Sequence, residues 1–127
     1  MKTYLVEVYT NGSIKWKHPE TKKLHRKDGP AVEYADGDKE WYIHDNLHRE
    51  DGPAIEYTNG DREWYIHGNP HREDGPAIEY TNGDREWYLN GEKLTEEEFL
   101  KRTTKHKELS IRELEEILGY PVKIIKE

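Results

Sequence analysis

The side chains that could do chemistry in this chain are mainly imidazoles and carboxylates. The sequence has seven histidines and no cysteine. His44 and His67 occupy equivalent places after a Trp-Tyr-Ile string and could form a row of ligands, but the next copy has Asn90 there. No carboxylate stands at a spacing typical of zinc or calcium sites, so we predict no bound metal. Three other histidines are expected to be turn residues whose rings pack on aromatic neighbours: His25, His48 and His71.

Enzymatic chemistry has little support in the sequence. A nucleophile needs a base beside it, yet the only serines, Ser13 and Ser110, lie outside any nucleophile-elbow motif. No glycine-rich phosphate or dinucleotide motif occurs. Carboxylates are plentiful, but they recur at a regular interval, which indicates a solvated face. We therefore predict no catalytic residue, no cofactor and no enzymatic activity.

Aromatic and acidic residues are the remaining candidates, as binding groups. Stacked copies would place the tryptophans in one file and the tyrosines on the opposite face, and one file must form the core. The other file would be partly open, and an aromatic strip rimmed by acids suits protein binding. The alternative is that both files pack internally. The candidate partner-binding residues are Trp41, Trp64, Trp87, Tyr42, Tyr65, Tyr88, Glu40, Glu63, Glu86, Asp61 and Asp84.

These residues recur because the chain repeats a unit of 23 residues. The string HREDGPAIEYTNGDREWY begins at His48 and again at His71, and a looser copy begins at His25. Such self-similarity indicates a repeat architecture, in which each unit gains a core by stacking on its neighbours. The shorter string YxxGxxxW begins at Tyr9, Tyr34, Tyr57 and Tyr80. We therefore expect four hairpins joined by three linkers.

Each copy reads as strand, turn, strand, with Asn-Gly or Asp-Gly dipeptides supplying the positive φ of a tight turn. A two-residue turn would place Glu56 opposite Glu63. A three-residue turn with a bulge at its glycine would instead place Glu56 opposite Arg62 and set Ala54 against Trp64. We favour the second register, because opposite charges across a strand pair stabilise it and like charges do not.

The linkers share the sequence HRxDGPA. Asp can bond its own backbone, Gly can adopt a left-handed conformation, and Pro can begin the next strand. We hypothesise that the Arg two residues before each Asp is its charge partner. The first linker is two residues longer, so residues 17–23 are expected to form a surface loop. The structural turn residues are Asp28, Gly29, Pro30, Asp51, Gly52, Pro53, Asp74, Gly75 and Pro76.

The chain divides into a repeat array over residues 1–94 and a C-terminal module over 95–127. Thr95 to Glu98 form a capping box for a helix running to about Thr103, and a second helix is expected from Ser110 to Gly119. Residues 120–125 read as a strand. This helix-helix-strand module would cap the array, since repeat stacks need a shielded end; partner binding is its alternative role.

Charge narrows the class of partner. The net charge is −7, and residues 25–94 alone carry 8 Lys/Arg against 17 Asp/Glu, which gives −9. An acidic surface repels phosphate backbones and anionic membranes, so nucleic acid is disfavoured and a basic protein surface is favoured. The alternative is that the charge only keeps the protein soluble. No apolar run approaches membrane-span length and no signal-peptide pattern begins the chain, so we expect a cytoplasmic protein.

The run HRxDGPA followed by YxxGxxxWYxxG resembles short tandem repeats, distantly similar to MORN repeats, found in many bacteriophage and bacterial proteins. The resemblance covers about residues 4–94. It implies successive antiparallel hairpins in an elongated, twisted sheet. The linker and the residues before each Trp differ from the MORN pattern, and the acidic charge argues against carrying over the lipid binding of some MORN proteins.

We therefore predict an α+β, mainly β fold: an elongated twisted antiparallel sheet of about four tandem β-hairpin repeats with a C-terminal helix-helix-strand cap. The expected function is non-enzymatic protein binding by a phage-encoded inhibitor in the host bacterial cytoplasm. It would occupy a basic host protein, such as a defence or nucleic-acid-processing complex. The alternatives are a structural or assembly scaffold and a nucleic-acid binder. Open hairpin edges also allow a homodimer.

Overall fold

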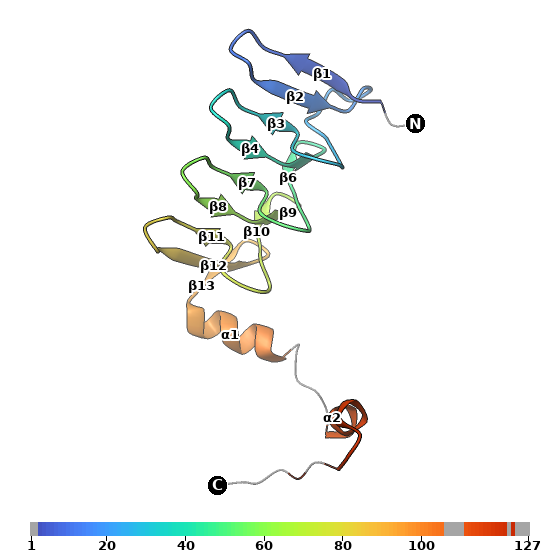
Figure 1. The fold of residues 1–127 in the computed structure, drawn as a ribbon, viewed down its shortest axis with the longest axis vertical. Coiled ribbons are helices and arrows are strands. Elements are labelled where there is room, and N and C mark those ends of the chain that lie inside the picture. Colours follow the sequence, from blue (N-terminus) through green and yellow to red (C-terminus); the bar gives the residue numbers. More distant parts are fainter. Residues whose placement is uncertain (1–2, 106–110, 122, 124–127) are drawn as a thin grey trace.

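The computed structural model describes residues 3–105, 111–121 and 123 of the 127-residue chain. Within them the fold is mainly β, with a nine-stranded antiparallel sheet, two two-stranded sheets and two helices. The predicted α+β, mainly β class is confirmed. Figure 1 shows the strand pairs following one another along the long axis, with the first helix at the end of the stack.

Neighbouring strands of the large sheet follow one another along the chain, except where a small hairpin intervenes. The pairs β1–β2, β3–β4, β7–β8 and β11–β12 form hairpins, and each hairpin also pairs antiparallel with the next. The strands are, in order across the sheet, β1 (Leu5–Val8), β2 (Ile14–Lys17), β3 (Val32–Glu33), β4 (Lys39–Glu40), β7 (Ile55–Glu56), β8 (Arg62–Glu63), β11 (Ile78–Glu79), β12 (Arg85–Leu89) and β13 (Glu92–Leu94).

The hairpin register is the one with the bulged three-residue turn. Glu56 lies opposite Arg62. The N–H of Gly60 donates to the carbonyl of Tyr57 over 3.0 Å, and Gly60 takes a φ of 100°. Within this turn, only Gly60 has a left-handed conformation. The Asn59 side chain instead accepts a hydrogen bond from the N–H of Asp61, at 2.9 Å.

The same register does not extend to Ala54 and Trp64, and that prediction was wrong. The N–H of Ala54 donates to Glu63 over 2.7 Å, while the N–H of Trp64 donates to Ala77 of the following copy, also over 2.7 Å. The chain leaves its own hairpin at Trp64 because a second, smaller hairpin begins there.

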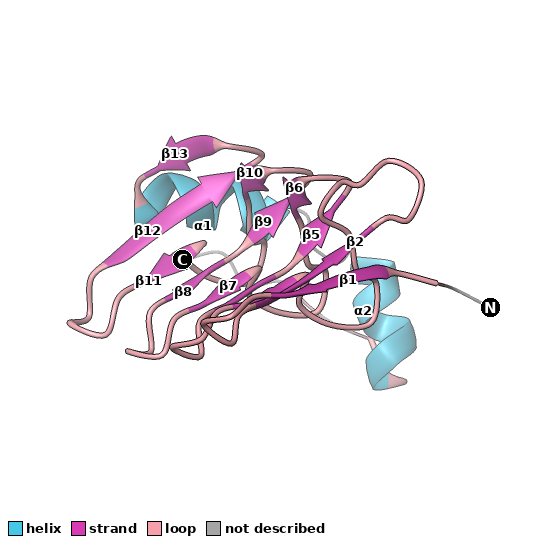
Figure 2. Ribbon diagram, turned by 90° about the horizontal axis from the view of Figure 1, so that it is seen from above, coloured by secondary structure: helices cyan, strands magenta, loops and turns pink. Residues whose placement is uncertain are grey.

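These small hairpins were not foreseen. β5 (Tyr42–Ile43) pairs with β6 (Asn46–Leu47), and β9 (Tyr65–Ile66) with β10 (Asn69–Pro70). The turn between β9 and β10 has φ of 50° at His67 and 82° at Gly68, as a two-residue type I′ turn requires. Figure 2, which looks along the stack, shows these hairpins gathered on one side of the main sheet.

Aliphatic side chains, together with Phe99 of the C-terminal module, form the core, which corrects the expectation that a file of tryptophans or tyrosines would do so. The tryptophans and tyrosines of both files are only half-buried. Ala54 is an example of a core residue: its carbonyl accepts from the N–H of Trp41 over 2.8 Å and its N–H donates to the carbonyl of Glu63, so the residue lies between two hairpins, and it is fully buried. The buried apolar residues are Ala31, Val32, Ala54, Ile55, Ala77, Ile78, Leu94 and Phe99.

The helix α1 (Glu96–Lys105) packs against β12 and β13. Thr95 caps it by accepting a hydrogen bond from the N–H of Glu98 at 3.1 Å, and Phe99 is only 3% exposed. The first helix of the expected C-terminal module is therefore present and packs on the last two strands.

A second helix, α2 (Ile111–Leu118), ends at Gly119, which has a φ of 79°. Its expected start at Ser110 lies outside the described residues. The same holds for much of the expected strand over residues 120–125, and the described residues of that segment, Tyr120, Pro121 and Lys123, are not in a strand.

Candidate functional site

Each linker arginine lies over the tryptophan of the hairpin before it. The guanidinium carbon of Arg49 is 3.9 Å from the centre of the Trp41 ring, and that of Arg72 is 3.8 Å from the Trp64 ring. Arg26 takes the same position over Trp16, at 3.9 Å. A cation over an indole face is attracted by the ring quadrupole, so these contacts help to join one unit to the next.

The same arginine also fixes its own linker. Arg49 Nε donates to Asp51 Oδ1 over 3.0 Å, and its Nη1 donates to the carbonyl of Pro53 over 3.1 Å and to Glu56 Oε1 over 3.2 Å. The expected Arg–Asp pair is present in all three linkers, at 3.0 Å here and at 3.2 and 2.9 Å in the others. The sequence did not reveal the proline carbonyl or the tryptophan as further partners.

The linker glycine gives space to this arginine, and backbone conformation does not account for it. A Cβ at Gly52 would lie 3.0 Å from the guanidinium carbon of Arg49, and one at Gly29 would lie 2.8 Å from that of Arg26. Neither glycine has a φ in the left-handed region, so the expected left-handed conformation was wrong. The side chain crosses over the glycine, so a methyl group there would have to displace the guanidinium.

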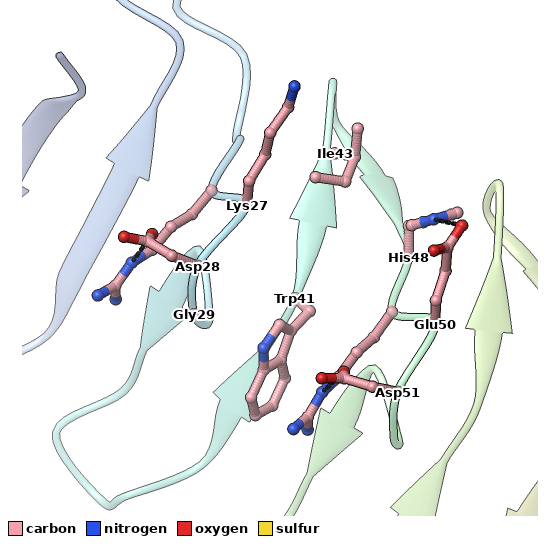
Figure 3. Close-up of a pocket in the computed structure, with 10 residues that line it drawn as sticks. Lys27, Asp28, Gly29, Trp41, Ile43, His48, Glu50 and Asp51 are labelled. Carbon is pink, nitrogen blue, oxygen red and sulfur yellow. Dashed lines mark hydrogen bonds and ion pairs between the residues drawn. The ribbon is translucent and has the colours of Figure 1, made fainter. Parts of the chain in front are cut away.

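Two equivalent pockets lie between successive linkers. The first has a volume of about 660 Å³; residues 26–29 line one side, residues 48–51 line the other, and Trp41 and Ile43 lie between them (Figure 3). The second, of about 830 Å³, repeats this arrangement one unit later with Trp64 and Ile66. Residues 49–51 line both pockets and form the wall between them.

The rim of these pockets carries exposed carboxylates. The side chains of Asp51 and Glu50 are 87% and 84% exposed, and that of Glu73 is 81% exposed. The half-buried Trp and Ile thus lie beneath acidic groups that solvent reaches. Ile43, Ile66, Glu50 and Glu73 were missed as site residues, although each recurs at the 23-residue interval that revealed the tryptophans.

The tyrosine file lies on the opposite face and is bonded to the glutamates. Trp87 and Tyr88 are successive residues of β12, so their side chains point to opposite faces. Glu86 accepts hydrogen bonds from Tyr80 and Tyr88 at 2.9 and 3.1 Å. Equivalent networks join Tyr34 and Tyr42 to Glu40, and Tyr57 and Tyr65 to Glu63.

This network changes the acidity of its members. Burial raises the pKa of Tyr57 to about 12, and the nearby Glu63 carboxylate adds to the effect. Burial and Glu63 likewise raise the pKa of Tyr65. The hydrogen bond from Tyr80, followed by that from Lys93, lowers the pKa of Glu86. The candidate glutamates and tyrosines of this face are therefore bound to one another.

The two candidate aspartates at the hairpin tips differ from each other. Asp61 Oδ1 accepts a hydrogen bond from the N–H of Thr81 in the following hairpin, at 2.9 Å, and so joins two tips. Asp84 is exposed in the last hairpin tip, where the only bond found to its side chain comes, among the described residues, from Asn82 at 3.3 Å.

Each linker histidine holds the small hairpin that ends the same 23-residue unit. His48 Nδ1 accepts from the N–H of His67 over 3.0 Å, and His71 Nδ1 accepts from the N–H of Asn90 over 2.9 Å. The rings of His48 and His67 also pack together, with centroids 4.7 Å apart. The donor is a backbone group, so Asn90 can replace histidine. Across residues 3–105, 111–121 and 123, no three His, Cys, Asp or Glu side chains are grouped to hold a metal ion.

In the part of the chain that the structure describes, neither helix is long and apolar enough to cross a membrane. Comparisons with models of known protein families, with curated proteins and with solved structures gave no match.

Proposed function

We propose that this protein is a non-enzymatic protein-binding module whose binding surface is the row of pockets between its linkers. The observation that carries the proposal is the recurrence of one open pocket in successive units, with a Trp and an Ile between two charged linkers. Acidic and basic residues balance in the lining of the first pocket, and acidic residues predominate in that of the second. Protein-binding surfaces are enriched in aromatic residues with a polar surround, which is the character of this row.

A partner with a basic surface fits the charge of these units. Residues 25–94 carry 17 acidic against 8 basic residues, and the linkers contribute the strongly exposed carboxylates of Glu50 and Glu73. Such a surface attracts cationic groups and repels phosphate backbones. With the resemblance to phage repeats, this supports occupation of a bacterial host protein as the mode of action.

A second candidate function is a scaffold that attaches through its C-terminal segment. Ile117 is 69% exposed, Leu118 42% and Tyr120 61%. Apolar side chains at this exposure could serve as an attachment point, with the repeat array as spacer.

Affinity capture from a bacterial lysate, followed by mass spectrometry, tests the two functions against each other. The proposal expects a protein that the unaltered chain and an Ile117→Ser/Leu118→Ser variant retain, and that a Glu50→Gln/Glu73→Gln variant loses. Capture that fails only with the Ile117→Ser/Leu118→Ser variant would favour the scaffold and contradict the proposal.

A further inference from the structure

The spacing of the pockets limits the ligands that can occupy two of them together. Each unit contributes two strands to the main sheet, and neighbouring strands lie about 4.8 Å apart. Equivalent points of successive units are therefore about 9.6 Å apart. The two pockets follow one another along the stack and share the wall formed by residues 49–51, so a single elongated ligand can reach both.

A polyproline II peptide matches this spacing. It has three residues per turn and rises about 3.1 Å per residue, so every third side chain returns to the same face after about 9.3 Å. A β-strand presents same-face side chains at about 6.6 and 13 Å, which misses the interval. An α-helix would have to place residues i and i+7 in the two pockets. Its residues i+3 and i+4 lie on the same face and would meet the wall formed by residues 49–51.

The chemistry of the pockets selects the side chain. Each pocket offers the apolar surface of a Trp and an Ile to a methylene stem. The exposed Glu50, which lines both pockets, and Glu73, which lines the second, offer carboxylates to a cationic head. Asp51 is instead paired with Arg49, and Lys27 lines the other wall of the first pocket. Lysine and arginine have this combination of stem and head. Aromatic-lined grooves are also the usual receptors of polyproline II segments.

We propose that the pocket row binds an extended, polyproline II segment of a protein with Lys or Arg at every third position. This inference rests on the proposed function and names the class of its ligand. The two pockets take two successive cationic side chains, and the residues between them pass over the linker wall. The register of three residues, rather than positive charge alone, sets the affinity.

Titration of the full chain with a synthetic peptide of four Lys-Pro-Pro triplets, followed by tryptophan fluorescence, tests this register. The control peptide has the same composition, with its lysines separated alternately by one and three residues, so that no two of them stand three positions apart. We expect the triplet peptide to bind at least about tenfold more tightly, because occupation of the second pocket becomes intramolecular. Equal affinity of the two peptides would overturn the inference.

A pair of variants checks the site. Glu50→Gln/Glu73→Gln should remove most of the preference for the triplet peptide, whereas Glu20→Gln/Glu97→Gln, which changes the net charge equally outside the pockets, should keep it. Loss of the preference in both variants would overturn the inference. If lysate capture depends on Glu50 and Glu73 but the triplet peptide does not bind, the inference fails and the proposed function stands; if both fail, both are wrong.

Discussion

At the scale of single residues, one arginine per linker connects groups that are distant in the sequence. Arg49 contacts the Trp41 ring, the Asp51 and Glu56 carboxylates and the Pro53 carbonyl, and its side chain is only 23% exposed. A planar guanidinium can stack and donate several hydrogen bonds at once, which a lysine cannot do. The linker therefore depends on arginine at this position.

Replacing the glycine beneath this arginine should destabilise the fold. Gly52→Ala places a methyl group against the Arg49 guanidinium and is expected to lower the free energy of unfolding by about 1–3 kcal/mol, the usual cost of overpacking. Urea unfolding of the variant and of the unaltered chain measures this change in the free energy of unfolding. In an Arg49→Ala background the same change should cost less than half as much, because the clash is gone. Equal costs in the two backgrounds would show that Gly52 is needed for another reason.

The tyrosine–glutamate face should lose stability at high pH. The pKa of Tyr57 is raised from 10.0 to about 12, so the folded state holds this proton more tightly than the unfolded state does. The resulting stabilisation is complete below pH 10 and is lost as the pH rises from 10 towards 12.

Absorbance of tyrosinate against pH, with unfolding measured in parallel, checks this expectation. Glu63→Gln removes the negative charge while keeping an acceptor, so it should move part of the late tyrosine titration to lower pH. An unchanged titration in Glu63→Gln would contradict the role assigned to the carboxylate.

At the scale of elements, the sequence predicted what depends on local rules and missed what depends on packing. The register of β7 and β8 follows from the bulged turn at Gly60 and from the facing charges of Glu56 and Arg62. The small hairpins were missed because residues 44–45 and 67–68 read His-Asp and His-Gly, which are poor turn signals, although Asn90-Gly91 is a strong one.

The core and the pockets could not be predicted from a single unit, because both depend on how neighbouring units are arranged. Aromatic rings bury more area than alanine, so composition pointed to an aromatic core. The stacking of hairpins instead buries Ala54 and the equivalent alanines of the other units completely, which composition does not reveal. The tryptophans of the site were identified from their spacing, but the pocket walls come from two different linkers and are set by how the units stack.

The helix α1 should contribute strongly to stability through one residue. Phe99 is 3% exposed whereas the adjacent Leu100 is 52% exposed. Phe99→Ala is expected to cost about 3–5 kcal/mol in the free energy of unfolding, and Leu100→Ala less than about 0.5 kcal/mol. Chemical denaturation of both variants measures the difference. Similar small costs would mean that α1 does not cap the array.

The opposite end of the sheet is an open edge. β1 pairs only with β2, among the described strands, and its Val6 and Val8 are 45% and 72% exposed. Such an edge can pair with a second copy of the chain. Sedimentation at increasing concentration should therefore show a dimer that Val8→Lys weakens. A chain that stays monomeric, or a dimer unaffected by this change, would exclude β1 as the dimer edge.

At the scale of the whole molecule, the units that begin at His48 and His71 are nearly identical in sequence. Residues 48–70 form one complete unit, and their removal joins Leu47 to His71, which restores the linker sequence in register. Stability in repeat arrays is close to a sum of unit and interface contributions. We therefore expect the shortened chain to fold cooperatively with a lower free energy of unfolding, as measured by circular dichroism during denaturation. An unfolded product would contradict the modular account.

The most direct test of the central claim is the affinity of the captured partner for the full chain and for this shortened chain, measured by titration calorimetry. The shortened chain keeps one of the two pockets and all of α1 and α2, so the account predicts at least about tenfold weaker binding. Equal affinity of the two folded chains would contradict it, because the partner would then be held elsewhere than along the row of pockets.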